Sequence, residues 1–143
     1  MRRSLLIVLA SAAVGIAARC APANFVRTHE PSWASIEIRE DLDFEQAWNY
    51  VIDVLARKFD LEVISKDGGY VRSSWIHNWW KPGELTEDYR VRVLVKFSPD
   101  RKVLDIRTEA NYFTGGSWVL GTDNSLLKTA KSDLMGVVGR TTR

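Results

Sequence analysis

The chain has 143 residues, of which 45% are hydrophobic and 27% are charged, so it is long and apolar enough for one globular domain with a packed core. Its single cysteine, Cys20, excludes a disulfide framework within the chain and a zinc knuckle of paired cysteines. Three of its 20 basic residues (Arg2, Arg3 and Arg19) lie in an N-terminal leader, so 17 basic and 18 acidic residues remain, with a net charge of −1. A nearly neutral chain is not expected to bind nucleic acid.

The start of the chain is typical of an export signal. Two arginines follow Met1, and the 14 residues from Leu5 to Ala18 are apolar or small, broken only by Ser11 and Gly15. This length fits the apolar part of a signal peptide, whereas a membrane-spanning helix needs about 20 residues. We therefore expect a leader that is removed on export, with an uncleaved membrane anchor as the alternative.

Cys20 stands at the end of this leader, in the order Ala17-Ala18-Arg19-Cys20, which resembles the lipobox of bacterial lipoproteins. The resemblance implies that residues 1–20 are a signal peptide ending at a cysteine that becomes acylated. Because Ala21 follows in place of an aspartate, it also implies an outer-membrane lipoprotein that faces the periplasm. Arg19 departs from the pattern, which has a small residue there. The alternative is cleavage after Ala21-Pro22-Ala23, which gives a soluble periplasmic or secreted protein.

The first elements of the domain follow this leader. Residues 21–31 have two prolines and no periodicity, so we expect a tether there. Residues 32–40 alternate between polar and apolar side chains, which predicts a half-buried strand. Asp43, with Gln46 three residues later, has the pattern of a capping box, and the apolar stripe that follows predicts a helix. The stripe consists of Phe44, Ala47, Trp48, Val51, Leu55 and Phe59.

Residues 61–77 are predicted to form a hairpin around the turn cluster Asp67-Gly68-Gly69. A three-residue loop pairs Val63 with Ser73 and keeps the apolar side chains of both strands on one face. A two-residue loop would set Val63 against Arg72. We therefore predict the three-residue loop.

A second hairpin is predicted over residues 89–109, where apolar and charged side chains alternate on both sides of a turn after Phe97. Pairing Phe97 with Lys102 brings the apolar residues of both strands to one face. On the other face, the same register sets Arg90 opposite Glu109, a favourable pair.

The sequence Thr122-Asp123 can cap a last helix, and Gly139 suits its end. The residues of this helix expected to face the core are Leu127, Ala130, Leu134 and Val138. Residues 32–143 are thus predicted to form a single α+β domain in the order β-α-β-β-β-β-α. This order indicates a two-layer sandwich, with an antiparallel sheet and two helices on one of its faces.

This order of elements resembles the TBP-like and helix-grip folds, and among exported proteins it is similar to the domains of the BamC family. These are lipoprotein accessories of the machine that assembles outer-membrane β-barrels. The resemblance implies a protein-binding role in the envelope. The resemblance covers residues 32–139, and it consists of the topology together with the lipoprotein-like start of the chain.

Sites for catalysis or for a metal ion are sparse. An acidic cluster could in principle hold a divalent cation, but it lacks the glycine and the final glutamate of an EF-hand, and it is better explained by a turn and a helix N-cap. His77 is the only histidine of the predicted domain and has no cysteine, serine motif or second histidine at a recognisable spacing. We expect no metal and no cofactor. The cluster consists of Glu37, Glu40, Asp41, Asp43 and Glu45.

Aromatic side chains are the more suggestive feature. They flank two predicted loops, residues 78–88 and 114–121, which we expect to lie near each other. Trp75 is expected in the core, while at least one of Trp79 and Trp80 is expected on the surface, because an alternating strand cannot bury both. Exposed aromatics favour protein interfaces or a membrane surface. The alternative is a loop folded back over its own core. The candidate partner-binding residues are Trp79, Trp80, Tyr112, Phe113 and Trp118.

The favoured hypothesis for function is a non-enzymatic envelope lipoprotein. Its domain would bind another envelope protein or an outer-membrane protein complex, as a scaffold or in outer-membrane assembly. The first alternative is a carrier that holds an apolar ligand between helix and sheet, although the bulky stripe of the first helix argues for a filled core. The second is a hydrolase-type enzyme, which only His77 and the acidic cluster support.

Overall fold

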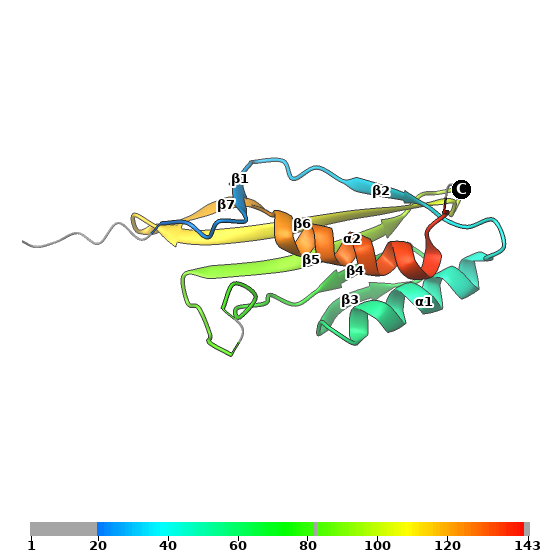
Figure 1. The fold of residues 1–143 in the computed structure, drawn as a ribbon, viewed down its shortest axis with the longest axis horizontal. Helices are drawn as coiled ribbons and strands as arrows, with labels where there is room; N and C mark the ends of the chain where they lie inside the picture. Colours follow the sequence, from blue (N-terminus) through cyan, green and yellow to red (C-terminus); the bar gives the residue numbers. More distant parts are fainter. Residues whose placement is uncertain (1–19, 82, 142–143) are drawn as a thin grey trace, which may run out of the picture.

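The computed structural model describes residues 20–81 and 83–141. The leader predicted before Cys20 lies outside these residues. Seven antiparallel strands form one sheet, and two helices pack side by side on one of its faces (Figure 1). The predicted α+β architecture is therefore confirmed. Within the described residues, no helix is both long and apolar enough to cross a membrane.

The sheet has the strand order β1-β7-β6-β5-β4-β3, and β2 pairs with β6 outside this path. The elements in chain order are β1 (Phe25–Arg27), β2 (Ala34–Glu37), α1 (Phe44–Ala56), β3 (Leu61–Ser65), β4 (Tyr70–Ser73), β5 (Tyr89–Phe97), β6 (Val103–Thr114), β7 (Ser117–Asp123) and α2 (Asn124–Val138).

The segment predicted to be a tether contains a strand. Phe25 to Arg27 form β1, which pairs with the end of β7. The Phe25 ring packs against Tyr89 and Tyr112 at centroid distances of 6.1 and 6.0 Å. The expectation of irregular structure throughout residues 21–31 is therefore wrong. A three-residue strand is too short to show periodicity, and its partner β7 comes near the end of the sequence.

The segment predicted to be a second aromatic loop is also a strand. Gly115 and Gly116 both have positive φ, at 59° and 80°, and they turn the chain directly from β6 into β7. This conformation is readily available to glycine, so the pair makes a tight hairpin where a break was expected. The sheet thereby gains β1 and β7 beyond the five strands predicted.

The long strand β6 shares one edge between two partners. Residues 103–106 pair with β2, and residues 110–114 pair with β7. Thr108 lies at the junction, where its hydroxyl donates to the Asp123 carbonyl (3.0 Å), accepts from the Asp123 N–H (3.2 Å) and contacts the Thr122 hydroxyl (2.6 Å). One buried side chain therefore closes the gap in the ladder.

The predicted capping box of α1 is confirmed. Asp43 Oδ1 accepts from the Gln46 N–H at 2.8 Å, and Gln46 Oε1 accepts from the Asp43 N–H at 3.1 Å. Both helix starts are capped by aspartate, since Asp123 caps α2 through a 2.8 Å bond from the Leu126 N–H. Such caps satisfy amides that have no partner within the helix.

Both predicted hairpin registers are wrong. In the first hairpin Val63 lies opposite Arg72, the alternative that the apolar pattern disfavoured, and a bulge between Leu61 and Val63 changes the register. The bulge returns Leu61 to the core face. The strand can therefore bury its apolar side chains although they do not alternate regularly with polar ones along its whole length.

In the second hairpin Phe97 pairs with Leu104, two positions beyond the predicted partner Lys102. A shift of two residues leaves every side chain on its predicted face, so the apolar pattern cannot distinguish these registers. Arg101, with a φ of +62°, lies in the longer turn.

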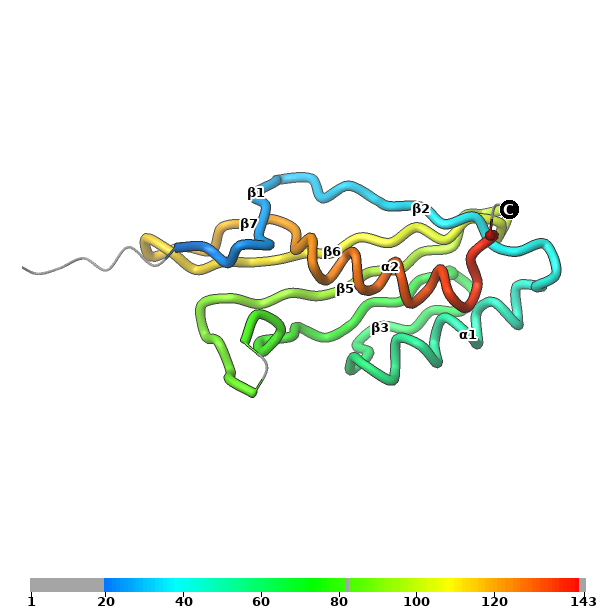
Figure 2. Tube along the Cα trace, viewed as in Figure 1, coloured from blue at the N-terminus to red at the C-terminus, as the bar shows by residue number. Residues whose placement is uncertain are grey.

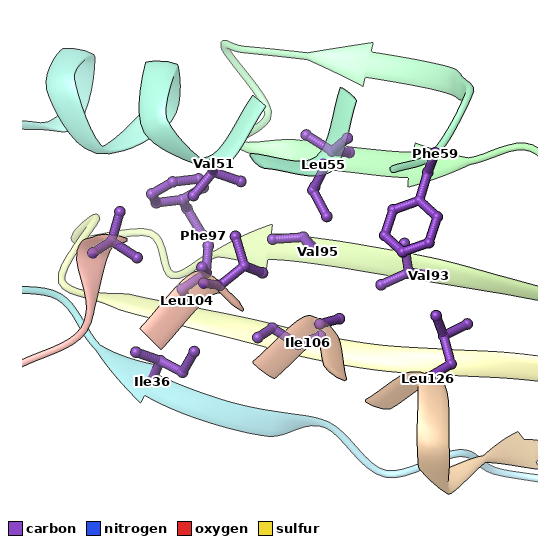
Figure 3. Packing of buried hydrophobic residues seen from close by; sticks show 14 of the residues in the cluster. Ile36, Val51, Leu55, Phe59, Val93, Val95, Phe97, Leu104, Ile106 and Leu126 are labelled. Carbon is purple, nitrogen blue, oxygen red and sulfur yellow. The ribbon is translucent and has the colours of Figure 1, made fainter. Parts of the chain in front are cut away.

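The core fills the layer between the helices and the sheet (Figure 3). Val51 and Leu55 from α1 and Leu126 from α2 meet the inward side chains of β5 and β6. At one end, the hydroxyl of the buried Tyr89 donates to Asp123 Oδ2 at 2.5 Å. Burial, together with this hydrogen bond, raises the pKa of the Tyr89 phenol far above its usual range.

The domain is elongated, with different segments at its two ends (Figure 2). The start of the described chain and the β6–β7 turn lie at one end, and the end of α2 lies at the other with the β5–β6 turn. The loop formed by residues 77–81 and 83–88 is on the side of the N-terminal end, as a hydrogen bond from the Phe113 N–H to the Asp88 carbonyl (2.7 Å) requires.

Candidate functional site

The structure distributes the predicted aromatic residues over three environments. Tyr112 lies in the core, with 5% of its surface exposed. Trp79 is half-buried and packs against Phe59 at a centroid distance of 6.5 Å. Phe113 and Trp118 are exposed and contact each other across the β6–β7 hairpin, with their centroids 5.3 Å apart. These four residues thus do not form one patch.

Trp80 is exposed on the loop that follows β4, as predicted for at least one of the two adjacent tryptophans. One edge of its ring contacts Tyr89 at 6.4 Å, and the ammonium group of Lys81 lies 5.0 Å from its centroid. Trp80 therefore belongs to the N-terminal end of the domain, apart from the open face of the sheet described next.

Trp75 lies outside the core, contrary to expectation. The register between β4 and β5 changes by one residue, because Arg72 pairs with Leu94 whereas Ile76 pairs with Val91. The extra residue brings Ile76 to the core and leaves Trp75 on the face without helices. The prediction was wrong because it assumed an uninterrupted alternation through residue 77.

The face of the sheet without helices carries three tryptophans that stack with three arginines. The guanidinium of Arg90 lies 4.4 Å from the Trp75 ring centroid and 4.7 Å from that of Trp118. Such stacking over an indole face is an attractive cation–π contact. Arg92 also stacks on Trp75 at 4.3 Å, and Arg107 stacks on Trp33 at 4.5 Å. We call this set the tryptophan–arginine face: Trp33, Trp75, Trp118, Arg90, Arg92 and Arg107.

One carboxylate neutralises part of this face. Glu109 accepts from Arg92 through Nε at 2.7 Å and Nη2 at 2.6 Å, and from Arg107 Nη2 at 2.8 Å. Arg90 differs from both, because no carboxylate of the described residues lies within 4.0 Å of its guanidinium. When the Asn111 amide is turned to the orientation that satisfies both of its atoms, its oxygen accepts from Arg90 Nη2 at 3.2 Å. The Nε of Arg90 is buried without a hydrogen-bond partner. The positive charge of Arg90 is therefore held between two indole rings with only a neutral acceptor.

A hollow of about 280 Å³ opens beside Trp75, between the sheet and the chain that links β1 to β2. The hollow is lined on the sheet side by Arg92, Glu109, Asn111 and Leu120. On the side of the linking chain it is lined by Thr28, His29 and Pro31. The hollow adds concave shape to the tryptophan–arginine face. His29 had been assigned to the tether and was therefore missed as a neighbour of this face.

The acidic cluster is a helix start neutralised by basic residues. Asp43 is the N-cap of α1, as predicted. Arg140 lies 3.4 Å from Glu40, and Lys66 pairs with Glu45. Among the described residues, no three acidic, histidine or cysteine side chains are grouped as metal ligands.

His77 is half-buried at the start of the loop that carries Trp80. Its carbonyl accepts hydrogen bonds from the N–H (2.9 Å) and the hydroxyl of Thr86, which close this loop. The hydrogen bonds described for His77 are thus made by its backbone carbonyl, which stabilises the loop.

One part of this face is predictable from the sequence. Arg90 and Arg92 alternate with buried valines along β5, so their place on the face opposite the core was predictable. Their stacking partners were not predictable, because Trp33 precedes β2, Trp75 follows a register shift and Trp118 lies in an unpredicted strand. These three tryptophans meet the arginines only in the folded sheet.

A scan of the chain against models of known protein families gives no match, and a search of curated protein sequences gives no significant match.

Proposed function

We propose that this protein is an exported envelope lipoprotein, acylated at Cys20, whose non-enzymatic domain binds another envelope protein through the tryptophan–arginine face. The resemblance of the predicted order of elements to the BamC domains makes a complex for outer-membrane assembly the first partner to examine. The proposal rests on the residues of the open face, since topology alone does not determine function.

The observation that carries the proposal is the environment of Arg90. Its guanidinium lies between Trp75 and Trp118 and has no carboxylate partner among the described residues. Tryptophan and arginine are the residue types most enriched at the energetic centres of protein interfaces. Trp118 remains 39% exposed, so a partner has apolar area to cover.

The expected partner presents a carboxylate beside an apolar side chain. The carboxylate would pair with Arg90, and the apolar group would cover Trp118 and Leu120, which is 51% exposed. Glu109 already pairs with Arg92 and Arg107, so these two arginines offer less uncompensated charge.

A filled core favours this function over that of a carrier. Large side chains such as Phe97, Leu55 and Leu104 are almost fully buried between the helices and the sheet. An apolar ligand in that layer would have to displace them, at the cost of the packing that they contribute.

Photo-crosslinking in intact cells tests the partner. A photo-reactive residue at position 120 lies on the open face, and one at position 50 lies on α1, where Tyr50 is 46% exposed. We expect a discrete protein adduct from position 120 and none from position 50. The same adducts from both positions, or none from position 120, would contradict the proposed surface.

A pair of charge variants then tests the residue. We expect Arg90→Gln to weaken association with the crosslinked partner by at least about tenfold, because it removes a charged group from the centre of the face. The control is Lys96→Gln on the same face, for which we expect less than about a threefold change, because Lys96 is exposed and lies toward the other end of β5. Equal effects would reject Arg90 as the centre.

Labelling with a clickable fatty acid tests the anchor. We expect incorporation into the wild-type chain and none into Cys20→Ser. An unlabelled wild type whose mature N-terminus is Asn24 would contradict the lipoprotein assignment and favour ordinary signal cleavage.

A further inference from the structure

The chain between Cys20 and the sheet is held against the domain. Pro22 is buried, and its carbonyl accepts from the Phe25 N–H at 2.9 Å. The Asn24 carbonyl accepts from the Asn124 N–H at 3.0 Å, directly before β1 pairs with β7. No flexible spacer is left between the cysteine and the first strand. An extended chain spans at most about 3.5 Å per residue, so Cys20 stays within about 7 Å of the buried Pro22.

The same end of the domain carries exposed apolar side chains. Cys20 and Ala21 line a hollow of about 670 Å³ together with Trp80, Lys81 and Leu85. Leu85 is 83% exposed, and Trp80 is 39% exposed. Thr86 fixes this position, because its hydroxyl and N–H bind the His77 carbonyl and leave the neighbouring Leu85 pointing away from the core.

We propose that this N-terminal end of the domain, with Trp80 and Leu85, lies in the interfacial layer of the membrane that Cys20 anchors. The occupant is a lipid bilayer, because the long apolar run of the sequence ends two residues before Cys20 and an acyl chain on Cys20 begins within the same hollow. Tryptophan favours the membrane interface, and a lysine beside it can reach the lipid phosphates. The inference rests on the acylation in the proposed function and adds an orientation to it.

Charge does not drive this contact. Glu84 and Glu87 are exposed near Lys81, so the end has no excess of positive charge for anionic lipids. We therefore expect the depth of insertion to be the same in zwitterionic and anionic bilayers, and unchanged by salt.

Spin labelling of the full acylated protein in phospholipid vesicles tests the orientation. Because Cys20 is the single cysteine and its sulfur carries the lipid, a nitroxide can be attached to Leu85→Cys alone. The matched control is Ile64→Cys, an exposed apolar position (55%) on β3, paired with Val71 near the opposite end of the sheet. Relaxation by oxygen, which partitions into lipid, is compared with relaxation by a water-soluble nickel chelate.

We expect the label at position 85 to be more accessible to oxygen than to the chelate, with the order reversed at position 64. A label at position 85 that behaves like the one at position 64 would overturn the orientation while leaving acylation intact. Failure of the proposed function is distinguishable, because a wild-type chain that reacts with maleimide has a free Cys20 thiol. That result would overturn both the acylation and the orientation.

Discussion

The two faces of the sheet use the same strands in different ways. On the side of the helices, Val93 and Val95 face a layer of buried aliphatic and aromatic side chains. On the other side, Leu94 is also buried, with 3% exposed, but its neighbours in the register are Arg72 and Arg107. One face is therefore stabilised by a second layer of structure, and the other is covered by its own long side chains, with arginine stems in place of helices. The comparison predicts that stability comes mainly from the first face and binding from the second.

Truncation in the helix-covered layer has the largest expected effect. Leu104→Ala should lower the free energy of unfolding by about 3 kcal/mol or more, because Leu104 is fully buried and the packed layer can collapse only in part. Urea denaturation measures it. A loss below about 1 kcal/mol would mean that this face is not close-packed.

The buried polar cluster at the end of this layer comes next. Asp123→Ala should cost about 2 kcal/mol, because it removes the cap of α2 and leaves the Tyr89 hydroxyl without its acceptor. Tyr89→Phe is the control and should cost less, about 1 kcal/mol, because the cap remains. If both variants have the same stability, the cap contributes nothing measurable.

Leu94→Ala is the closest counterpart of Leu104→Ala on the open face. We expect a loss of about 2 kcal/mol, toward the lower limit for a buried leucine, because the arginine side chains beside it can move into the space. A loss equal to that of Leu104→Ala, measured by the same denaturation, would show that the open face is packed as tightly as the core and would remove the contrast.

Glu109→Gln should have a smaller effect on stability, of about 1 kcal/mol or less, because its ion pairs with Arg92 and Arg107 are partly exposed to solvent. It should nevertheless strengthen the crosslinked complex, since it leaves two more arginines free for a partner carboxylate. Unchanged or weaker binding would show that Glu109 orders the arginines and that the ordering matters more than the charge.

The smallest effect is expected far from both faces, at the β5–β6 turn. Hydrogen bonds from the Ser98 hydroxyl and the Lys102 N–H hold the pKa of the Asp100 carboxyl below its usual range. A lowered pKa in the folded state stabilises the fold above the ordinary value of about 3.9, and this contribution is lost as the pH falls through the lowered value. The difference in Tm between wild type and Asp100→Asn should therefore be larger at pH 6 than at pH 3. A constant difference would exclude this cause.

Local patterns predicted the elements that depend on near neighbours. The capping box at Asp43 is present, and the stripe from Phe44 to Leu55 lies on α1, whereas its last predicted member, Phe59, follows the end of the helix. The registers of the hairpins depend on bulges and turn lengths. The alternation of apolar residues does not reveal these when each side chain stays on the same face of the sheet. β1 was not predicted because its three residues form a strand only by pairing with β7, which comes near the end of the domain sequence.

The candidate site divides in the same way. Two adjacent tryptophans in one loop predicted that at least one of Trp79 and Trp80 is exposed, and the exposed one is Trp80. Tyr112 is a candidate partner-binding residue in the sequence because it lies beside a predicted loop. In the structure β6 continues to Thr114 and places Tyr112 in line with the inward Leu104 and Ile106. The tryptophan–arginine face required both a register shift and an extra strand, neither of which is encoded locally.

The edge of β6 that is shared by β2 and β7 constrains the order in which the chain can fold. β1 and β2 are the first strands to emerge during synthesis or translocation, and their partners β7 and β6 are among the last. The early strands must wait with unpaired backbone groups until almost the whole chain has been synthesised, because these pairings close only over a large sequence separation. A chain held back before its final helix would display unpaired edges that invite aggregation, so a helper that shields nascent strands would benefit it.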